Sequence, residues 1–236
     1  MVNAAASSTD RLVRHLTAGA TGSTTDELAG WLASSPRFRA FADAHRDKIR
    51  KKLRGATDDA SRLDVRAELQ VVHRLLADRR ISLEFEPGGS SRGGPDFAVT
   101  FRDHPAFNLE VTRPRRDPDA AAIRHVVLAK LRQLPAGAPN VLLVVFGAGT
   151  VTAEEIVDAA RELRSAADAG NPTVLARGRF GSPRDFYARF LRLGAVVTWV
   201  EDAPGGRRPA AWNNPSARIA VPERALDACL AALGDA

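Results

Sequence analysis

The chain has 236 residues, of which 44% are hydrophobic and 26% charged, and its 34 lysines and arginines against 28 acids leave a net charge of +6. This length and apolar content are typical of a folded domain with a real core, and no apolar run approaches the roughly 20 residues of a membrane-spanning helix. The single cysteine, Cys229, excludes an intramolecular disulfide and a zinc cluster built on thiolates.

The beginning of the chain and its few histidines narrow the class of protein further. The N-terminal segment has no basic stretch followed by an apolar one, so we expect no secretory signal and a cytoplasmic location. The five histidines show no paired ligand spacing. A metal bound by this chain is therefore predicted to be a hard cation with oxygen ligands rather than zinc.

Residues 1–57 are predicted to form an N-terminal helical extension, and residues 58–236 an α/β domain. Residues 24–27, Thr-Thr-Asp-Glu, have the pattern of a capping box, and Ser35 followed by Pro36 is typical of a helix with proline at its first position. The break between the two parts is predicted where glycine, threonine and aspartate gather just before residue 60.

A basic helix is predicted over residues 46–54, where six lysines and arginines accompany Ile49 and Leu53. Such a helix can lie against phosphates, where release of counterions provides affinity that does not depend on base sequence. The alternative is an ordinary solvated face. The candidate nucleic-acid-binding residues are Arg46, Arg50, Lys51 and Arg54.

A further helix, predicted over residues 63–76 with Ser61 as its cap, carries a carboxylate on its apolar side. At about 100° per residue its leucines and valines form one broad arc, and Glu68 falls in the middle of that arc. Because a buried, unpaired carboxylate costs several kcal/mol, Glu68 needs a partner, and a cation is the simplest one. A salt bridge to an arginine, or a helix rotated to bring Glu68 to water, is the alternative. The opposite side carries Arg66, Gln70, His73 and Arg74.

Two strands with a period of two are predicted over residues 96–101 and 107–112, joined by a turn. Each strand has one apolar face and carries an acid, Asp96 or Glu110, on the other face. Opposed residues of an antiparallel hairpin share a face, so the two acids can cooperate if Asp96 lies opposite Glu110 or Thr112. A slip of one residue would place them on opposite faces.

The rest of the chain alternates helices and strands. The Gly- and Ser-rich residues 87–94 are predicted to form a loop that enters the region of Asp96. Later elements are predicted as a helix at about 119–134, strands at 141–146 and 195–201, helices at 153–167 and 183–193, and a last helix opening at Pro222.

The order of these elements resembles the PD-(D/E)XK nuclease superfamily. The resemblance is carried by the helix with Glu68, a strand at 81–86, Pro95-Asp96, Glu110-Val111-Thr112, a helix and the strand at 141–146. It implies a three-layer, restriction-endonuclease-like α-β-β-β-α-β core with a mixed sheet. It also implies that Asp96 and Glu110 bind Mg²⁺ or Mn²⁺, with Glu68 as the helix acid and a further metal ligand. The family's lysine, two residues after the glutamate, is Thr112 here.

Lys130 is the candidate replacement for the missing lysine. On the predicted helix at 119–134 the same angular count places Lys130 near the centre of the apolar arc. In some members of the superfamily the lysine has moved to a neighbouring element, including the following helix. Arg113 is the second choice, although its side chain should point away from the face of Thr112. The alternative for Lys130 is that its ammonium group reaches out to water.

These features predict a divalent-metal-dependent nuclease-like enzyme that hydrolyses phosphodiester bonds of nucleic acid, DNA in the first place, with no membrane partner. The alternative is an inactive nuclease-fold protein that binds nucleic acid or another protein, which Thr112 favours. Three acids and a lysine at core-facing positions favour the enzyme. The sequence leaves the oligomeric state open, a homodimer included. The candidate catalytic residues are Glu68, Asp96, Glu110, Thr112, Arg113 and Lys130.

Overall fold

The computed structural model describes residues 7–20, 22–87, 94–201 and 208–234. Its described part is an α/β protein with ten helices and one mixed six-stranded sheet. The chain divides into two compact units, Met1–Arg79 and Arg80–Ala236. No helix among the described residues is both long and apolar enough to cross a membrane.

The N-terminal unit consists, in its described part, of five helices packed around leucines, valines, phenylalanines, alanines and one isoleucine. The side chain of Ser35 caps α3 and accepts a hydrogen bond from the Phe38 amide, with Pro36 at the first helical position, as the sequence predicts. The helices are α1 (Ser8–Thr17), α2 (Ser23–Ser34), α3 (Pro36–Ala44), α4 (Arg46–Gly55) and α5 (Asp59–Leu75).

The start of α2 differs from the prediction. Its N-cap is Gly22, which has no side chain to cap the helix, so the predicted capping box at residues 24–27 is wrong. Glu27, the acid of that box, instead pairs with Arg66 of α5, with 2.5 Å between Oε2 and Nε. An ion pair between two helices has therefore taken the place of a local helix cap.

Helix α5 belongs with the N-terminal helices, although the sequence assigned it to the domain at 58–236. Its N-cap is Asp58, which accepts a hydrogen bond from the amide of Ser61, so Ser61 is not the cap. Arg66 and Gln70, which the sequence places on the side opposite the apolar arc, are also buried. The ion pair with Glu27 compensates the buried charge of Arg66.

His73 of α5 makes the stability of this unit depend on pH. Its ring stacks on Trp31 of α2, with 5.5 Å between ring centroids, and burial, followed by the charge of Arg74, lowers its pKa below 6.5. The unfolded state therefore binds the proton more readily, so stability should fall as the pH decreases below 6.5.

We expect His73→Phe, which keeps an aromatic ring on Trp31, to reduce the fall in melting temperature as the pH decreases below 6.5. Trp31 fluorescence in a background that lacks Trp199 and Trp212 measures the transition locally. A His104→Phe variant of the C-terminal unit is the control. The interpretation fails if His73→Phe keeps the parent's dependence between pH 6.5 and about 5.

The C-terminal unit is built on a sheet in the order β1-β2-β3-β4-β5-β6. Strand β2 is antiparallel to both β1 and β3, strands β3, β4 and β5 are parallel, and β6 is antiparallel to β5. The strands are β1 (Ile81–Phe85), β2 (Phe97–Phe101), β3 (Phe107–Thr112), β4 (Asn140–Phe146), β5 (Leu193–Val200) and β6 (Ala210–Asn213). The helices are α6 (Ala120–Lys130), α7 (Ala153–Asp168), α8 (Pro172–Arg177), α9 (Pro183–Phe190) and α10 (Glu223–Gly234).

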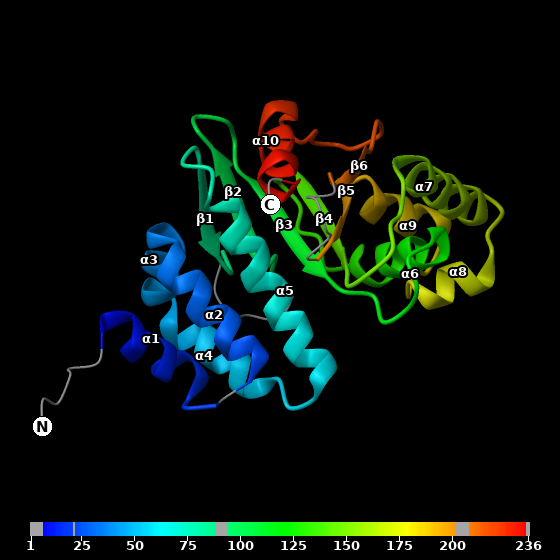
Figure 1. Cartoon of the computed structure of the whole chain (residues 1–236). Helices are drawn as coiled ribbons and strands as arrows, with labels where there is room; N and C mark the ends of the chain where they lie inside the picture. The colour runs from blue at the N-terminus through cyan, green and yellow to red at the C-terminus, as the bar shows by residue number, and fades with distance from the viewer. Residues whose placement is uncertain (1–6, 21, 88–93, 202–207, 235–236) are drawn as a thin grey trace, which may run out of the picture. The chain divides into compact units, whose positions relative to one another are not determined.

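The main core of this unit lies between one face of the sheet and the helices α6, α7 and α9. Helix α10 contacts β2 and lies away from these helices in Figure 1. All residues of β4 are buried, as expected for a parallel strand covered on both faces. The strands β1 to β5 and the helices α6, α7 and α9 lie within a few residues of their predicted positions.

Candidate functional site

The hairpin of β2 and β3 brings the two predicted metal-binding acids together. Phe97 pairs with Leu109 and Ala98 with Asn108, so continuing this register by one residue places Asp96 opposite Glu110. Oδ2 of Asp96 also accepts a hydrogen bond of 2.9 Å from the amide of Val111, next to Glu110. This is the register in which the two acids share a face.

Glu110 and Thr112 point to the side of the sheet that α6 covers. Their partners on the parallel strand β4 are Leu142 and Val144, which belong to the core beneath α6 and α7. The side chain of Glu110 is only 9% exposed. A carboxylate at this depth needs a compensating charge, because burial without one costs several kcal/mol.

Lys130 provides that charge. It is the last residue of α6, and its ammonium Nζ lies 2.7 Å from Oε1 of Glu110. The Lys130 side chain is 24% exposed, so the ion pair sits at the edge of the core rather than in free solvent. Lys130, which the sequence identifies as the replacement lysine, thus contacts Glu110, one of the two predicted metal-binding acids.

Arg113, the second choice for the replacement lysine, pairs with a different acid. Its Nε is 3.4 Å from Oε1 of Glu201, which follows β5 and is buried. The guanidinium group passes Gly147 at the end of β4, where Nη2 would lie 3.6 Å from an added Cβ. Sequence reasoning missed Glu201, for which the only signal is an acid directly after a buried strand.

Glu68 belongs to the N-terminal unit, where it pairs with a lysine. Oε2 of Glu68 lies 2.5 Å from Nζ of Lys52 on α4, and the Glu68 side chain is 16% exposed. A salt bridge was the alternative explanation for this carboxylate, with an arginine expected where the structure has a lysine. Its role as the helix acid of a metal site stays a prediction.

Some basic side chains of α4 form ion pairs within the N-terminal unit. Arg46 lies 3.6 Å from Asp43, and Lys52 binds Glu68. Lys51 and Arg54 are exposed, whereas Arg50 is partly buried. Binding of nucleic acid by this helix stays a prediction.

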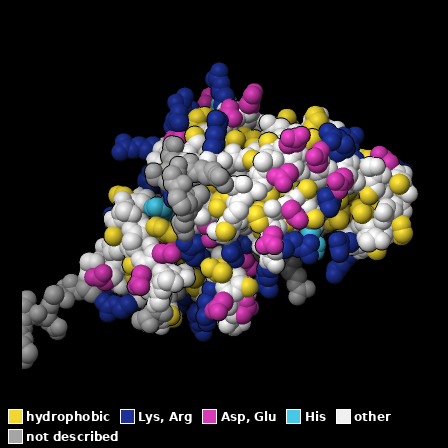
Figure 2. All heavy atoms as spheres, turned by 45° about the vertical axis from the view of Figure 1, so that its right-hand side comes forward, with side chains coloured by type: hydrophobic (Ala, Val, Ile, Leu, Met, Phe, Trp, Pro, Cys, Tyr) yellow, Lys and Arg dark blue, Asp and Glu magenta, His cyan; other side chains and the backbone are white. Residues whose placement is uncertain are grey.

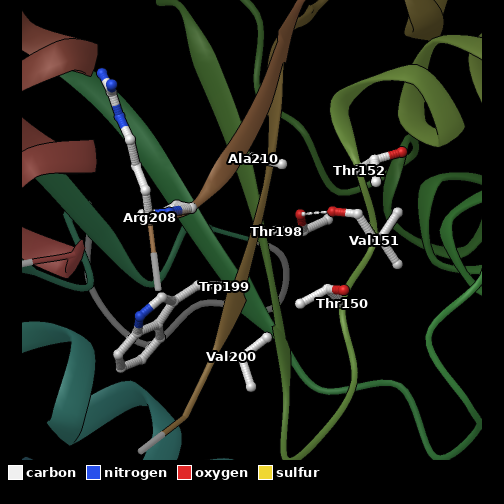
Figure 3. Close-up of a pocket in the computed structure, with 9 residues that line it drawn as sticks. Thr150, Val151, Thr152, Thr198, Trp199, Val200, Arg208 and Ala210 are labelled. Atoms are coloured by element: carbon white, nitrogen blue, oxygen red, sulfur yellow. Dashed lines mark hydrogen bonds between the residues drawn. The ribbon is translucent and has the colours of Figure 1, made fainter. Parts of the chain in front are cut away.

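A cavity of about 240 Å³ lies between the loop before α7, the end of β5 and the start of β6. Figure 3 shows Val151 and Thr152 on one side of the strands and Arg208 on the other. The hydroxyl of Thr198 donates to the carbonyl of Val151, and Thr152 shares a capping box with Glu155. These polar groups hold the loop before α7 and take no part in the cluster at Glu110.

The cluster of Asp96, Glu110 and Lys130 is therefore the candidate site. Among the described residues, no three side chains of histidine, cysteine, aspartate or glutamate are grouped so that they could hold a metal ion. Most of the predicted loop at 87–94 lies outside the described residues. Comparison of the chain with family models, curated proteins and solved structures finds no match.

Proposed function

We propose that the protein is a divalent-metal-dependent phosphodiesterase of nucleic acid, with Asp96, Glu110 and Lys130 as its site. The observation that carries this proposal is the contact of 2.7 Å between Lys130 and Glu110, with Asp96 opposite Glu110 in the hairpin. Two acids and a cation at one place are the groups that phosphodiester hydrolysis needs.

The chain order of the elements supports a restriction-endonuclease-like core. Helix α5 is followed by the antiparallel strands β1, β2 and β3, then by α6 and by β4, which is parallel to β3. This is the α-β-β-β-α-β order that the resemblance implies. Asp96 directly precedes the second strand of that order, Glu110 lies on the third, and Lys130 ends its second helix.

The residues of this site fit Mg²⁺ or Mn²⁺. Hard carboxylate oxygens suit these ions, and Mg²⁺ is usually held by one or two carboxylates together with water and substrate phosphate. Asp96 and Glu110 would hold the ion. When bound, it would polarise the phosphodiester and lower the pKa of the attacking water.

Lys130 would then stabilise the negative charge that develops on the phosphate. Its ammonium group has three donors, and the bond to Glu110 uses one of them. Glu110 keeps the ammonium in place. Thr112, a neutral hydroxyl on the same face of β3, cannot supply this electrostatic effect.

Metal binding is the first test. Because only the folded state holds the site, Mn²⁺ or Mg²⁺ at about ten times Kd should raise the melting temperature by about 3–6 °C. Asp96→Asn with Glu110→Gln should abolish the shift. The control, Glu154→Gln with Asp158→Asn on α7, removes the same charge and should keep it. An unchanged shift in the first double variant would mean that the metal binds elsewhere.

The alternative function is a binding module on the same scaffold. Two observations favour it: Thr112 stands at the position of the motif lysine, and the described acids form no group of three that could hold a metal. The absence of Mn²⁺-dependent cleavage of single- and double-stranded DNA and RNA by the parent protein would support the binding module.

A further inference from the structure

Two arginines act electrostatically on a histidine of α6, His125. Arg116 lies in the loop between β3 and α6, His125 lies on α6, and Arg177 ends α8, which contacts α6. Both arginines are exposed, and His125 is partly buried. Figure 1 shows α8 beside α6 at the side of the sheet away from α10.

The charges of these two arginines are not neutralised by an ion pair within the described part of the chain, and the acids next to Arg116 in the sequence are Asp117 and Asp119. Neither Arg116 nor Arg177 has an ion pair with a described residue, whereas Arg124 on α6 pairs with Glu162 at 2.5 Å. Burial, followed by the charges of Arg116 and Arg177, lowers the pKa of His125. Two exposed cations act on the same histidine, one from the loop before α6 and one from α8, which contacts α6, and this favours binding of an anion there.

We propose that Arg116 and Arg177 bind the sugar-phosphate backbone of the nucleic acid on which the Asp96–Glu110–Lys130 site acts. This inference rests on the proposed function. Guanidinium groups bind phosphate with two parallel hydrogen bonds, and exposed groups suit a polymer that runs across the surface.

The distance to the candidate site fits a continuous strand. Arg116 follows Glu110 by six residues, a span of at most about 21 Å. A nucleic-acid strand rises about 3.4 Å per nucleotide, so a phosphate at Arg116 would lie within about six nucleotides of the cleaved bond. Arg116 is thus close enough to hold the substrate without touching the reacting phosphate.

The test is the salt dependence of binding, measured by fluorescence anisotropy with labelled duplex DNA in EDTA, where metal-dependent cleavage is blocked. Arg116→Gln with Arg177→Gln should reduce the slope of log affinity against log salt by about two units. Affinity at about 0.1 M salt should fall roughly tenfold per lost contact. The control Arg224→Gln, which removes an exposed charge from α10, should keep the parent's slope and affinity.

His125 reports whether the phosphate lies at this cluster. A bound phosphate should raise the pKa of His125, measured by NMR, because it offsets the charges of Arg116 and Arg177. A slope of the double variant equal to that of Arg224→Gln, with an unmoved His125 pKa, would overturn this inference even if the parent cleaves DNA. A lower slope in a protein that cleaves nothing would support the surface and contradict the proposed function.

Discussion

Lys130→Met is expected to slow Mn²⁺-dependent cleavage of nucleic acid at least about a hundredfold, the effect of removing one preorganised stabilising group. Lys130 holds its ammonium group 2.7 Å from Glu110 at the edge of the core, where charge is screened less than in water. Methionine keeps most of the side-chain volume but removes the charge. The loss should appear in single-turnover rates at saturating metal.

Two further variants separate the charge of Lys130 from its packing. Lys130→Arg keeps a cation and should recover part of the rate, although the planar guanidinium group will not place its donors in the same positions. Arg161→Met on α7 removes an exposed cation that pairs with Asp158, and the rate should stay unchanged. Full activity of Lys130→Met would exclude Lys130 as the replacement lysine and direct attention to Arg113.

The second large effect is on stability. Lys130→Met leaves Glu110, whose side chain is 9% exposed, without this cation, and we expect the free energy of unfolding to fall by about 2–4 kcal/mol. Fully buried pairs lose about 3–5 kcal/mol when one partner is removed, and the partial exposure of Lys130 reduces the effect. Urea unfolding measures this difference.

The double variant Glu110→Gln with Lys130→Met should regain most of the lost stability, because it removes the uncompensated carboxylate as well. Removing Asp158 from its exposed pair with Arg161 should cost no more than about 1 kcal/mol. Equal losses in the single and double variants would show that Lys130 stabilises the protein by packing rather than by charge. Cleavage assays under conditions where Lys130→Met is folded separate its loss of cleavage rate from its loss of stability.

Local patterns predicted much of the sheet and part of the site. Strand β3 has the predicted bounds, Phe107–Thr112, because its alternation of apolar and polar residues is strict and a turn precedes it. Lys130 was found in the same way, as a charge on the apolar arc of a helix. Such signals depend only on residues within a few turns or one strand of each other.

The features that sequence missed depend on partners far apart in the chain. Arg113 turns to Glu201, and Arg66 is buried because Glu27 of another helix compensates it. The register of the hairpin was left open because a period of two defines the faces of a strand but not which residues of the two strands oppose each other. The six-residue helix α8 and the four-residue strand β6 are too short to show a period.

A crystal structure with bound Mn²⁺, located by its anomalous scattering, tests the central claim most directly. Our proposal predicts a single strong peak bonded to carboxylate oxygens of both Asp96 and Glu110, with the ammonium group of Lys130 beside it. The same crystals of Asp96→Asn with Glu110→Gln should lack the peak. Saturating Mn²⁺ that leaves no peak at these two acids in the parent protein would contradict the proposed metal site.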